Sequence, residues 1–118
     1  MPEQGATLDQ QRCVPCEGGV PALGDAEAQA LADELGAGWR IVSGHHIEKE
    51  YRFVNFADAL QFANQVGRIA EAEGHHPDLL VGWGRVKAYL WTHSVNGLTR
   101  NDFVLAAKIE QLARQPLA

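Results

Sequence analysis

Three histidines and one proline are the residues of this 118-residue chain best suited to acid–base chemistry. His75, His76 and Pro77 are consecutive, and His93 lies further along, at the end of an expected strand. An imidazole has an unperturbed pKa of about 6.5, so it can give or accept a proton near neutral pH. Two adjacent imidazoles, with a third that a hairpin returns toward them, therefore indicate an acid–base site.

A pair of histidines is also common on solvated loops, and for an isolated pair that interpretation is the stronger one. Two neighbours favour a site here. Glu71 lies one helical turn before His75, so we expect its carboxylate to face and orient that imidazole. Pro77 holds an extended backbone and biases His76 away from helix, which fixes the two rings on a short linker.

Caps and apolar spacing predict the three helices that would position these side chains. The first extends over residues 25–35 and the second over 55–73. The third begins after Thr99, with Asp102 at its third position. A Thr–Asp capping box explains Asp102 without any role in a site.

Two hairpins are expected between the helices. The strand over 47–53 has one polar face, whereas the strand over 86–92 is apolar on both faces, as expected of a central strand. Residues 43–44 form the turn of the first hairpin, and 84–85 suit a two-residue turn in the second. The expected strands cover residues 39–42, 47–53, 79–83 and 86–92. The resulting order αββαββα predicts an α+β domain, a four-stranded antiparallel sheet with three helices on one face.

The domain is expected to cover residues 25–118, after an irregular leader over 1–24 whose Pro and Gly content disfavours regular structure. The helix over 55–73 carries an apolar arc wider than one sheet contact needs, from Phe56 and Leu60 onward. We therefore expect this helix to contact its own sheet and a second subunit, in a homodimer or homotetramer. A well-buried helix in a monomer is the alternative.

Composition excludes several classes of partner. The net charge of −5 and the pI of about 5.4 argue against nucleic acid, which needs a basic surface. The chain has no apolar run near the roughly 20 residues of a membrane span, and its first residues lack a signal-peptide pattern. A cytoplasmic location is the simplest expectation.

The two cysteines, Cys13 and Cys16, suggest a zinc site as an alternative. His45 and His46 are the next histidines, and they follow well beyond the roughly 12–15 residues of a compact finger. We therefore expect no metal site. Aromatic residues near the hairpins, such as Trp91, could stack on a flat ligand, although packing also explains them.

Several spaced motifs resemble the signature of the pterin-4a-carbinolamine dehydratases. These motifs are Glu71 with His75-His76-Pro77, Thr92-His93, Gly97-Leu98-Thr99 and Asp102. The segment 47–62 and the leader around Cys13 and Cys16 are also similar to members of that family. The resemblance extends over about residues 39–113, and residues 82–84 depart from the family's usual stretch before the turn.

The resemblance implies dehydration of 4a-hydroxytetrahydrobiopterin, or a related pterin, to quinonoid dihydropterin and water. This reaction recycles the cofactor of aromatic amino-acid hydroxylases, which makes such a hydroxylase a possible pathway partner. Loss of the 4a-hydroxyl needs a proton delivered to the leaving oxygen and one removed from N5. Imidazoles can do both, so no metal and no organic cofactor are expected.

The resemblance also implies roles for individual residues. His75, His76 and His93 would be catalytic, with His75 and His93 flanking the pterin as the acid–base pair. The substrate-binding or orienting residues would be Glu71, Pro77 and Asp102. The family's fold further implies a four-stranded antiparallel sheet and a dimer of dimers.

A second class of function is open to the same fold. Some relatives act as dimerisation cofactors of transcription factors, and others resemble assembly chaperones for carbon-fixing enzymes. Chaperone-like members are expected to lose catalytic residues, whereas this chain keeps all three histidines. The sequence therefore favours an enzyme, a hydro-lyase, over a non-catalytic binding module.

Overall fold

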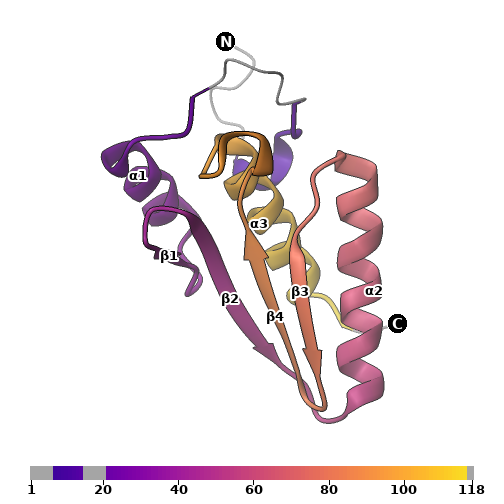
Figure 1. Ribbon diagram of the computed structural model, residues 1–118. Helices are drawn as coiled ribbons and strands as arrows, with labels where there is room; N and C mark the ends of the chain where they lie inside the picture. Colours follow the sequence, from indigo (N-terminus) through magenta and orange to yellow (C-terminus); the bar gives the residue numbers. More distant parts are fainter. Residues whose placement is uncertain (1–6, 15–20, 117–118) are drawn as a thin grey trace.

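A computed structural model describes residues 7–14 and 21–116, and in this part of the chain three helices cover one face of a four-stranded antiparallel sheet (Figure 1). The order αββαββα and the α+β class are confirmed. Two short 3₁₀ helices add to it, η1 (Leu8–Gln10) and η2 (His93–Val95). The main elements are α1 (Asp25–Leu35), β1 (Arg40–Val42), β2 (His46–Arg52), α2 (Phe56–Glu73), β3 (Asp78–Gly82), β4 (Arg85–Leu90) and α3 (Arg100–Ala113).

The sheet has the strand order β1-β2-β4-β3, so β2 and β4 are central. Alternation along β4 separates the two faces: Val86, Ala88 and Leu90 are buried, whereas Lys87 and Tyr89 between them are half-buried. The buried side chains point to the helix layer, and the polar ones point to an open face. The sheet therefore has one core face and one face available to solvent or ligands.

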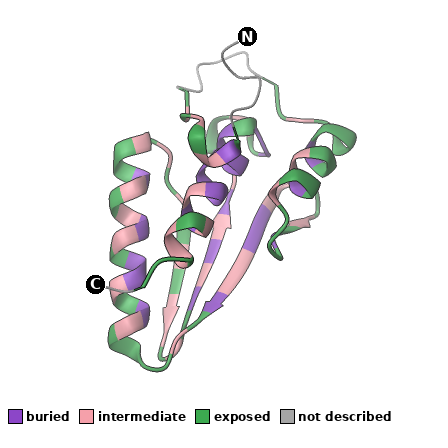
Figure 2. Cartoon of the chain, turned by 180° about the vertical axis from the view of Figure 1, so that it is seen from behind, coloured by how far each residue is buried: buried purple, intermediate pink, exposed green. Residues whose placement is uncertain are grey.

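The centre of the helix layer is α3, whose residues 101–107 are all buried. Its neighbours are α1 on one side and α2 on the other, and the buried stripes of all three helices turn toward the sheet (Figure 2). Phe62 of α2 and Phe103 of α3 are among the largest fully buried side chains. The candidate site residue Asp102 therefore lies in a fully buried stretch of α3.

Both predicted ends of α2 are confirmed. The Asn55 side chain accepts a hydrogen bond from the Asp58 backbone N–H at 2.8 Å, which caps the start. Gly74 ends the helix in a left-handed conformation, with φ of 67°. This turn redirects the chain, so that His75 and His76 leave the helix axis instead of extending it.

The apolar arc of α2 divides differently from the predicted stripe. The core side consists of Ala59, Phe62, Ala63, Val66 and Ala70. Phe56 and Leu60, which the sequence placed in the main stripe, are 45% and 42% exposed. The predicted stripe therefore combined residues of the buried side of α2 with residues of its exposed side. The sequence shows which residues of a helix are apolar but not which of them face the sheet.

The turn of the second hairpin is shifted by one residue from the prediction. Gly82 pairs with Arg85, so the loop is Trp83-Gly84 and not Gly84-Arg85. A Cβ on Gly84 would lie 2.9 Å from the Phe53 carbonyl oxygen, and the Phe53 N–H donates to the Gly84 carbonyl at 2.8 Å. A side chain at position 84 would clash with the Phe53 carbonyl, so this position of the loop requires glycine.

The leader contributes structure of its own. Leu8 of η1 is buried in the core, and Lys108 of α3 donates to the Asp9 carbonyl oxygen at 2.8 Å. Residues 7–14 therefore pack on α3. Cys16 lies outside the described residues. No helix in the described part of the chain combines the length and the apolar character that a membrane crossing needs.

Candidate functional site

The predicted histidine site is assembled at one end of the molecule, where α2 and β4 end and α3 begins (Figure 1). His75, His76 and His93 line a single pocket of about 260 Å³. The other lining residues are Val14, Gly74, Trp91, Thr92, Ser94 and Asn101. The fold therefore brings together the three imidazoles that the sequence singled out.

His75 is held by Asp102. Its Nε2–H donates to Asp102 Oδ1 at 2.6 Å, and the carboxylate is fully buried. The other carboxylate oxygen accepts from the Thr92 hydroxyl and from the Thr99 N–H, both at 2.9 Å. Since Nε2 is committed to Asp102, Nδ1 is the nitrogen of His75 that is left to exchange a proton with a bound molecule.

The same carboxylate thus has two functions. It completes the predicted capping box at the start of α3, and it orients His75 across the boundary between α2 and α3. Asp102 is absent from the pocket lining, and its carboxylate contacts His75 behind the pocket wall. Capping alone does not account for this residue.

The predicted pairing of Glu71 with His75 is wrong. Glu71 instead accepts a hydrogen bond from His76 Nε2 at 2.5 Å, and both side chains are largely exposed. The reason is the left-handed turn at Gly74, which ends the helix before His75 and removes the expected one-turn spacing. Glu71, His76 and Pro77 line a neighbouring, more apolar hollow.

His93 reaches the pocket from the segment that follows β4. The Thr92 N–H donates to the Gly97 carbonyl at 2.8 Å, which closes a short loop around η2. The His93 ring contacts Trp91 edge to face, with 4.5 Å between ring centroids. His93 is exposed, whereas His75 is the more buried of the two rings.

The leader supplies a wall that the sequence did not reveal. The Val14 N–H donates to Asn101 Oδ1 at 2.9 Å, and Asn101 Nδ2 donates to the Val14 carbonyl at 2.6 Å. Asn101 is itself only 5% exposed. This two-point contact places Val14 at the rim of the histidine pocket, and no motif in the sequence signals it.

Cys13 is not prepared for nucleophilic chemistry. Burial raises the pKa of its thiol to about 12, and the Glu73 carboxylate adds to the effect. Glu73 accepts from the Cys13 N–H at 2.9 Å. Burial raises the pKa of Glu73, but this hydrogen bond together with Lys108 and Arg12 outweighs burial and holds that pKa below its usual range. Cys13 therefore anchors the leader through its backbone.

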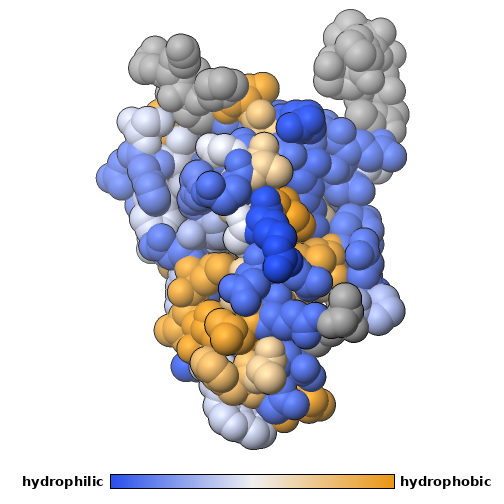
Figure 3. All heavy atoms as spheres, turned by 90° about the vertical axis from the view of Figure 1, so that its right-hand side faces the viewer, coloured by the Kyte–Doolittle hydropathy of each residue, from blue (hydrophilic) through white to orange (hydrophobic). Residues whose placement is uncertain are grey.

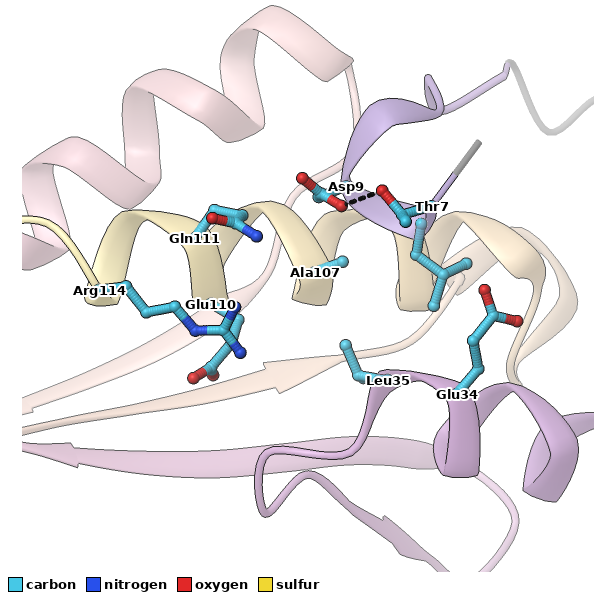
Figure 4. A pocket seen from close by; sticks show the side chains of 9 residues that line it. Thr7, Asp9, Glu34, Leu35, Ala107, Glu110, Gln111 and Arg114 are labelled. Carbon is cyan, nitrogen blue, oxygen red and sulfur yellow. Dashed lines mark hydrogen bonds between the residues drawn. The ribbon is translucent and has the colours of Figure 1, made fainter. Parts of the chain in front are cut away.

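The described residues contain no group of three or more His, Cys, Asp or Glu side chains arranged to hold a metal ion. A further pocket of about 260 Å³ lies between η1, α1 and α3 (Figure 4). Two of its three acidic side chains have partners: Glu110 accepts from Lys49 and Tyr51, both at 2.7 Å, and Asp9 accepts from Thr7. This pocket contains none of the predicted site residues.

Comparison with known proteins identifies a family for this chain. The sequence profile described as pterin 4 alpha carbinolamine dehydratase matches residues 21–112. A Rubrobacter xylanophilus protein with a provisional pterin-4-alpha-carbinolamine dehydratase name is 49% identical over 105 residues, covering 89% of this chain and 97% of the relative. A similarly named Rickettsia canadensis protein is 50% identical over 103 residues, covering 87% and 94%.

Solved structures agree on the fold. A Brucella melitensis transcriptional coactivator/pterin dehydratase has a TM-score of 0.72 at 33% identity, covering 78% of this chain and 98% of that one. A pterin dehydratase-like RuBisCO assembly factor of the alpha-carboxysome has a TM-score of 0.57 at 20% identity, covering 70% and 96%, which shows a common fold alone. From its sequence match and its relatives, the chain is a member of the pterin-4-alpha-carbinolamine dehydratase family.

Proposed function

We propose that this chain dehydrates a 4a-hydroxytetrahydropterin, such as 4a-hydroxytetrahydrobiopterin, to quinonoid dihydropterin and water. The observation that carries the proposal is the His75–Asp102 pair in one pocket with His76 and His93. A buried, fully hydrogen-bonded carboxylate holds one imidazole in a defined orientation and stabilises its protonated form. That is the arrangement a proton-transfer site needs.

In the proposed reaction, an imidazole removes the proton on N5 of the pterin. The electron pair of the N5–H bond forms the N5=C4a double bond as the C4a–O bond breaks. The leaving oxygen takes a proton from a second imidazole and departs as water. The products are the quinonoid dihydropterin and water, so no oxidant, reductant or cofactor is required.

We assign the base to His75, because Asp102 stabilises the imidazolium that forms when His75 accepts the N5 proton. His93, on the solvent side of the pocket, would protonate the leaving oxygen. His76 would assist binding and proton transfer, oriented by Glu71, while Pro77 fixes the segment that carries it. Each well-placed acid or base typically contributes about 10²–10⁴-fold to the rate.

The reaction would recycle the pterin cofactor of an aromatic amino-acid hydroxylase, in the cytoplasm. A non-catalytic protein-binding role is less well supported, because the three imidazoles share one pocket. The test is the dehydration of chemically generated 4a-hydroxytetrahydropterin, followed by absorbance in the presence and absence of the purified protein. A rate no faster than that of buffer would overturn the proposal.

We further propose a homodimer or homotetramer assembled through the outward side of α2. Val54, Phe56 and Leu60 are exposed near the start of this helix. Viewed from the α2 side, apolar surface gathers toward the lower half of the molecule (Figure 3). Large apolar side chains on one surface are typical of sites that contact another protein.

A further inference from the structure

Glu73, the last residue of α2, is a buried acidic group that the proposed reaction does not use. Its side chain is only 8% exposed. The C-terminal end of a helix carries partial negative charge, and the last turn of α2 has no basic residue to offset it. A buried carboxylate at this end of the helix is unfavourable by itself, so its contacts with other segments must stabilise it.

Those contacts come from two other parts of the chain. The leader contributes the Cys13 N–H, which donates to the Glu73 carboxylate at 2.9 Å, and the Arg12 side chain, whose Nε lies 3.1 Å away. From α3, Lys108 Nζ lies 3.7 Å from the same carboxylate. Glu73 therefore connects the end of α2 to α3 and to the leader at one point.

The position of His75 depends on the last turn of α2. The His75 backbone N–H donates to the Ala70 carbonyl at 3.2 Å, and the Gly74 N–H donates to the same carbonyl. The backbone of His75 is therefore bonded to the turn that contains Glu73. A shift of this turn would move the imidazole with it.

Two contacts join the end of α2 to α3. One is the ion pair of Glu73 with Lys108, and the other, two residues further along the chain, is the hydrogen bond of 2.6 Å between His75 and Asp102. A hydrogen bond weakens steeply when its distance and angle change, whereas an ion pair depends less on direction. The first contact can therefore maintain the spacing that the second one requires.

We propose that Glu73 is a positioning residue, which holds the last turn of α2 against α3 and the leader and so keeps His75 in hydrogen-bonding geometry with Asp102; the inference rests on the proposed function. Glu73 does not line the histidine pocket, so contacts with a bound pterin should survive its removal. The rim residue Val14 is held separately by Asn101. Loss of Glu73 is therefore expected to lower kcat and to leave KM largely unchanged.

The test compares the kinetics of Glu73→Ala, Glu73→Gln and the wild-type protein. Glu73→Ala is expected to lower kcat about 5- to 50-fold with KM changed less than about 2-fold, since a small displacement of a catalytic group reduces the rate steeply. Glu73→Gln keeps an acceptor for the Cys13 N–H, so its kcat should lie between the two. The control is Glu50→Ala, which removes a carboxylate bound to Arg52 at 2.6 Å and Arg85 at 3.4 Å and should leave kcat unchanged.

A merely structural role of Glu73 would not change kcat, because the molecules that remain folded would turn over as the wild-type protein does. A second readout needs no substrate: proton NMR follows the exchange of the His75 Nε2–H with solvent. This exchange should be faster in Glu73→Ala than in wild type and unchanged in Glu50→Ala. If Glu73→Ala does not fold, Glu73→Gln serves in both measurements.

Unchanged exchange of the His75 Nε2–H in the Glu73 variant would overturn the positioning role, and so would an equal loss of kcat in Glu50→Ala. If this exchange becomes faster but the wild-type protein catalyses no dehydration, the positioning role stands and the proposed reaction fails.

Discussion

At the scale of single residues, Asp102 explains most of the site. Its carboxylate caps α3, accepts from Thr92 and orients His75. The three histidines that the sequence singled out line one pocket in the structure. The sequence assigned the wrong acidic partner to His75, because a one-turn spacing holds only while the helix continues and Gly74 ends it. The role of Asn101 depends on a contact with a distant segment, which no local pattern encodes.

Asp102→Asn tests the orienting role. The amide keeps the size of the side chain but removes the charge that stabilises protonated His75, so kcat is expected to fall by about 10²-fold or more with a smaller change in KM. Stability should fall by about 1–3 kcal/mol, as for a disturbed buried hydrogen-bond network. Steady-state kinetics and thermal unfolding measure the two effects. Asp33→Asn on the exposed side of α1 is the control, and an unchanged kcat in Asp102→Asn would refute the role.

Glu48 predicts how stability depends on pH. The hydrogen bond from Arg40, with help from Lys87 and His46, outweighs burial and lowers the pKa of Glu48 from 4.5 to about 2. A carboxyl whose pKa is lower in the folded state stabilises the fold above the unfolded value, and that contribution is lost as the pH falls from 4.5 toward 2. Urea unfolding of wild type and Glu48→Gln should therefore differ more at pH 6 than at pH 3. A difference independent of pH would contradict this explanation.

At the scale of elements, helix caps and strand alternation were sufficient to predict the order of helices and strands. Asn55, Gly74 and Thr99 lie at helix ends. Their capping depends on hydrogen bonds and backbone conformations within a few residues, so the local sequence predicts it. The loop at Trp83-Gly84 was misplaced by one residue, because the approach of Phe53 to Gly84 is a contact between distant segments. The docking of η1 on α3 is likewise a tertiary effect, and the leader lacks the periodicity that would reveal it.

Asn101→Ala tests the leader as a wall of the pocket. Without the two hydrogen bonds to Val14, the rim should loosen, and KM for the pterin is expected to rise about 3- to 10-fold with kcat largely kept. Arg100→Ala is a matched control, because Arg100 bonds the leader at Gln11, away from the pocket. Equal KM values for wild type and Asn101→Ala would exclude a role of this wall in binding.

At the scale of the whole molecule, the helix layer has apolar side chains that the sheet does not bury. The inner side of α2 is buried on β3 and β4, while Phe56 and Leu60 remain outside. The sequence predicted this excess from the width of the apolar arc. It could not predict which residues face outward, because that depends on the rotation of α2 on the sheet.

Leu60→Glu tests the proposed assembly. A charge in an apolar interface is costly to bury, so the variant is expected to shift toward monomer while its circular dichroism stays like that of wild type. Analytical ultracentrifugation of both proteins over a range of concentrations measures the shift. Ala30→Glu, at an exposed position of α1, should leave the mass unchanged. A wild-type protein that sediments as a monomer at all concentrations would contradict the assembly.

The central claim is that the pocket of His75, His76 and His93 performs the dehydration. The most direct measurement is the initial rate of dehydration of 4a-hydroxytetrahydropterin by wild type, His75→Ala, His76→Ala and His93→Ala, with folding of each variant checked by circular dichroism. We expect losses of about 10²–10⁴-fold in His75→Ala and His93→Ala and a smaller loss in His76→Ala. Rates close to wild type in all three variants would contradict the claim.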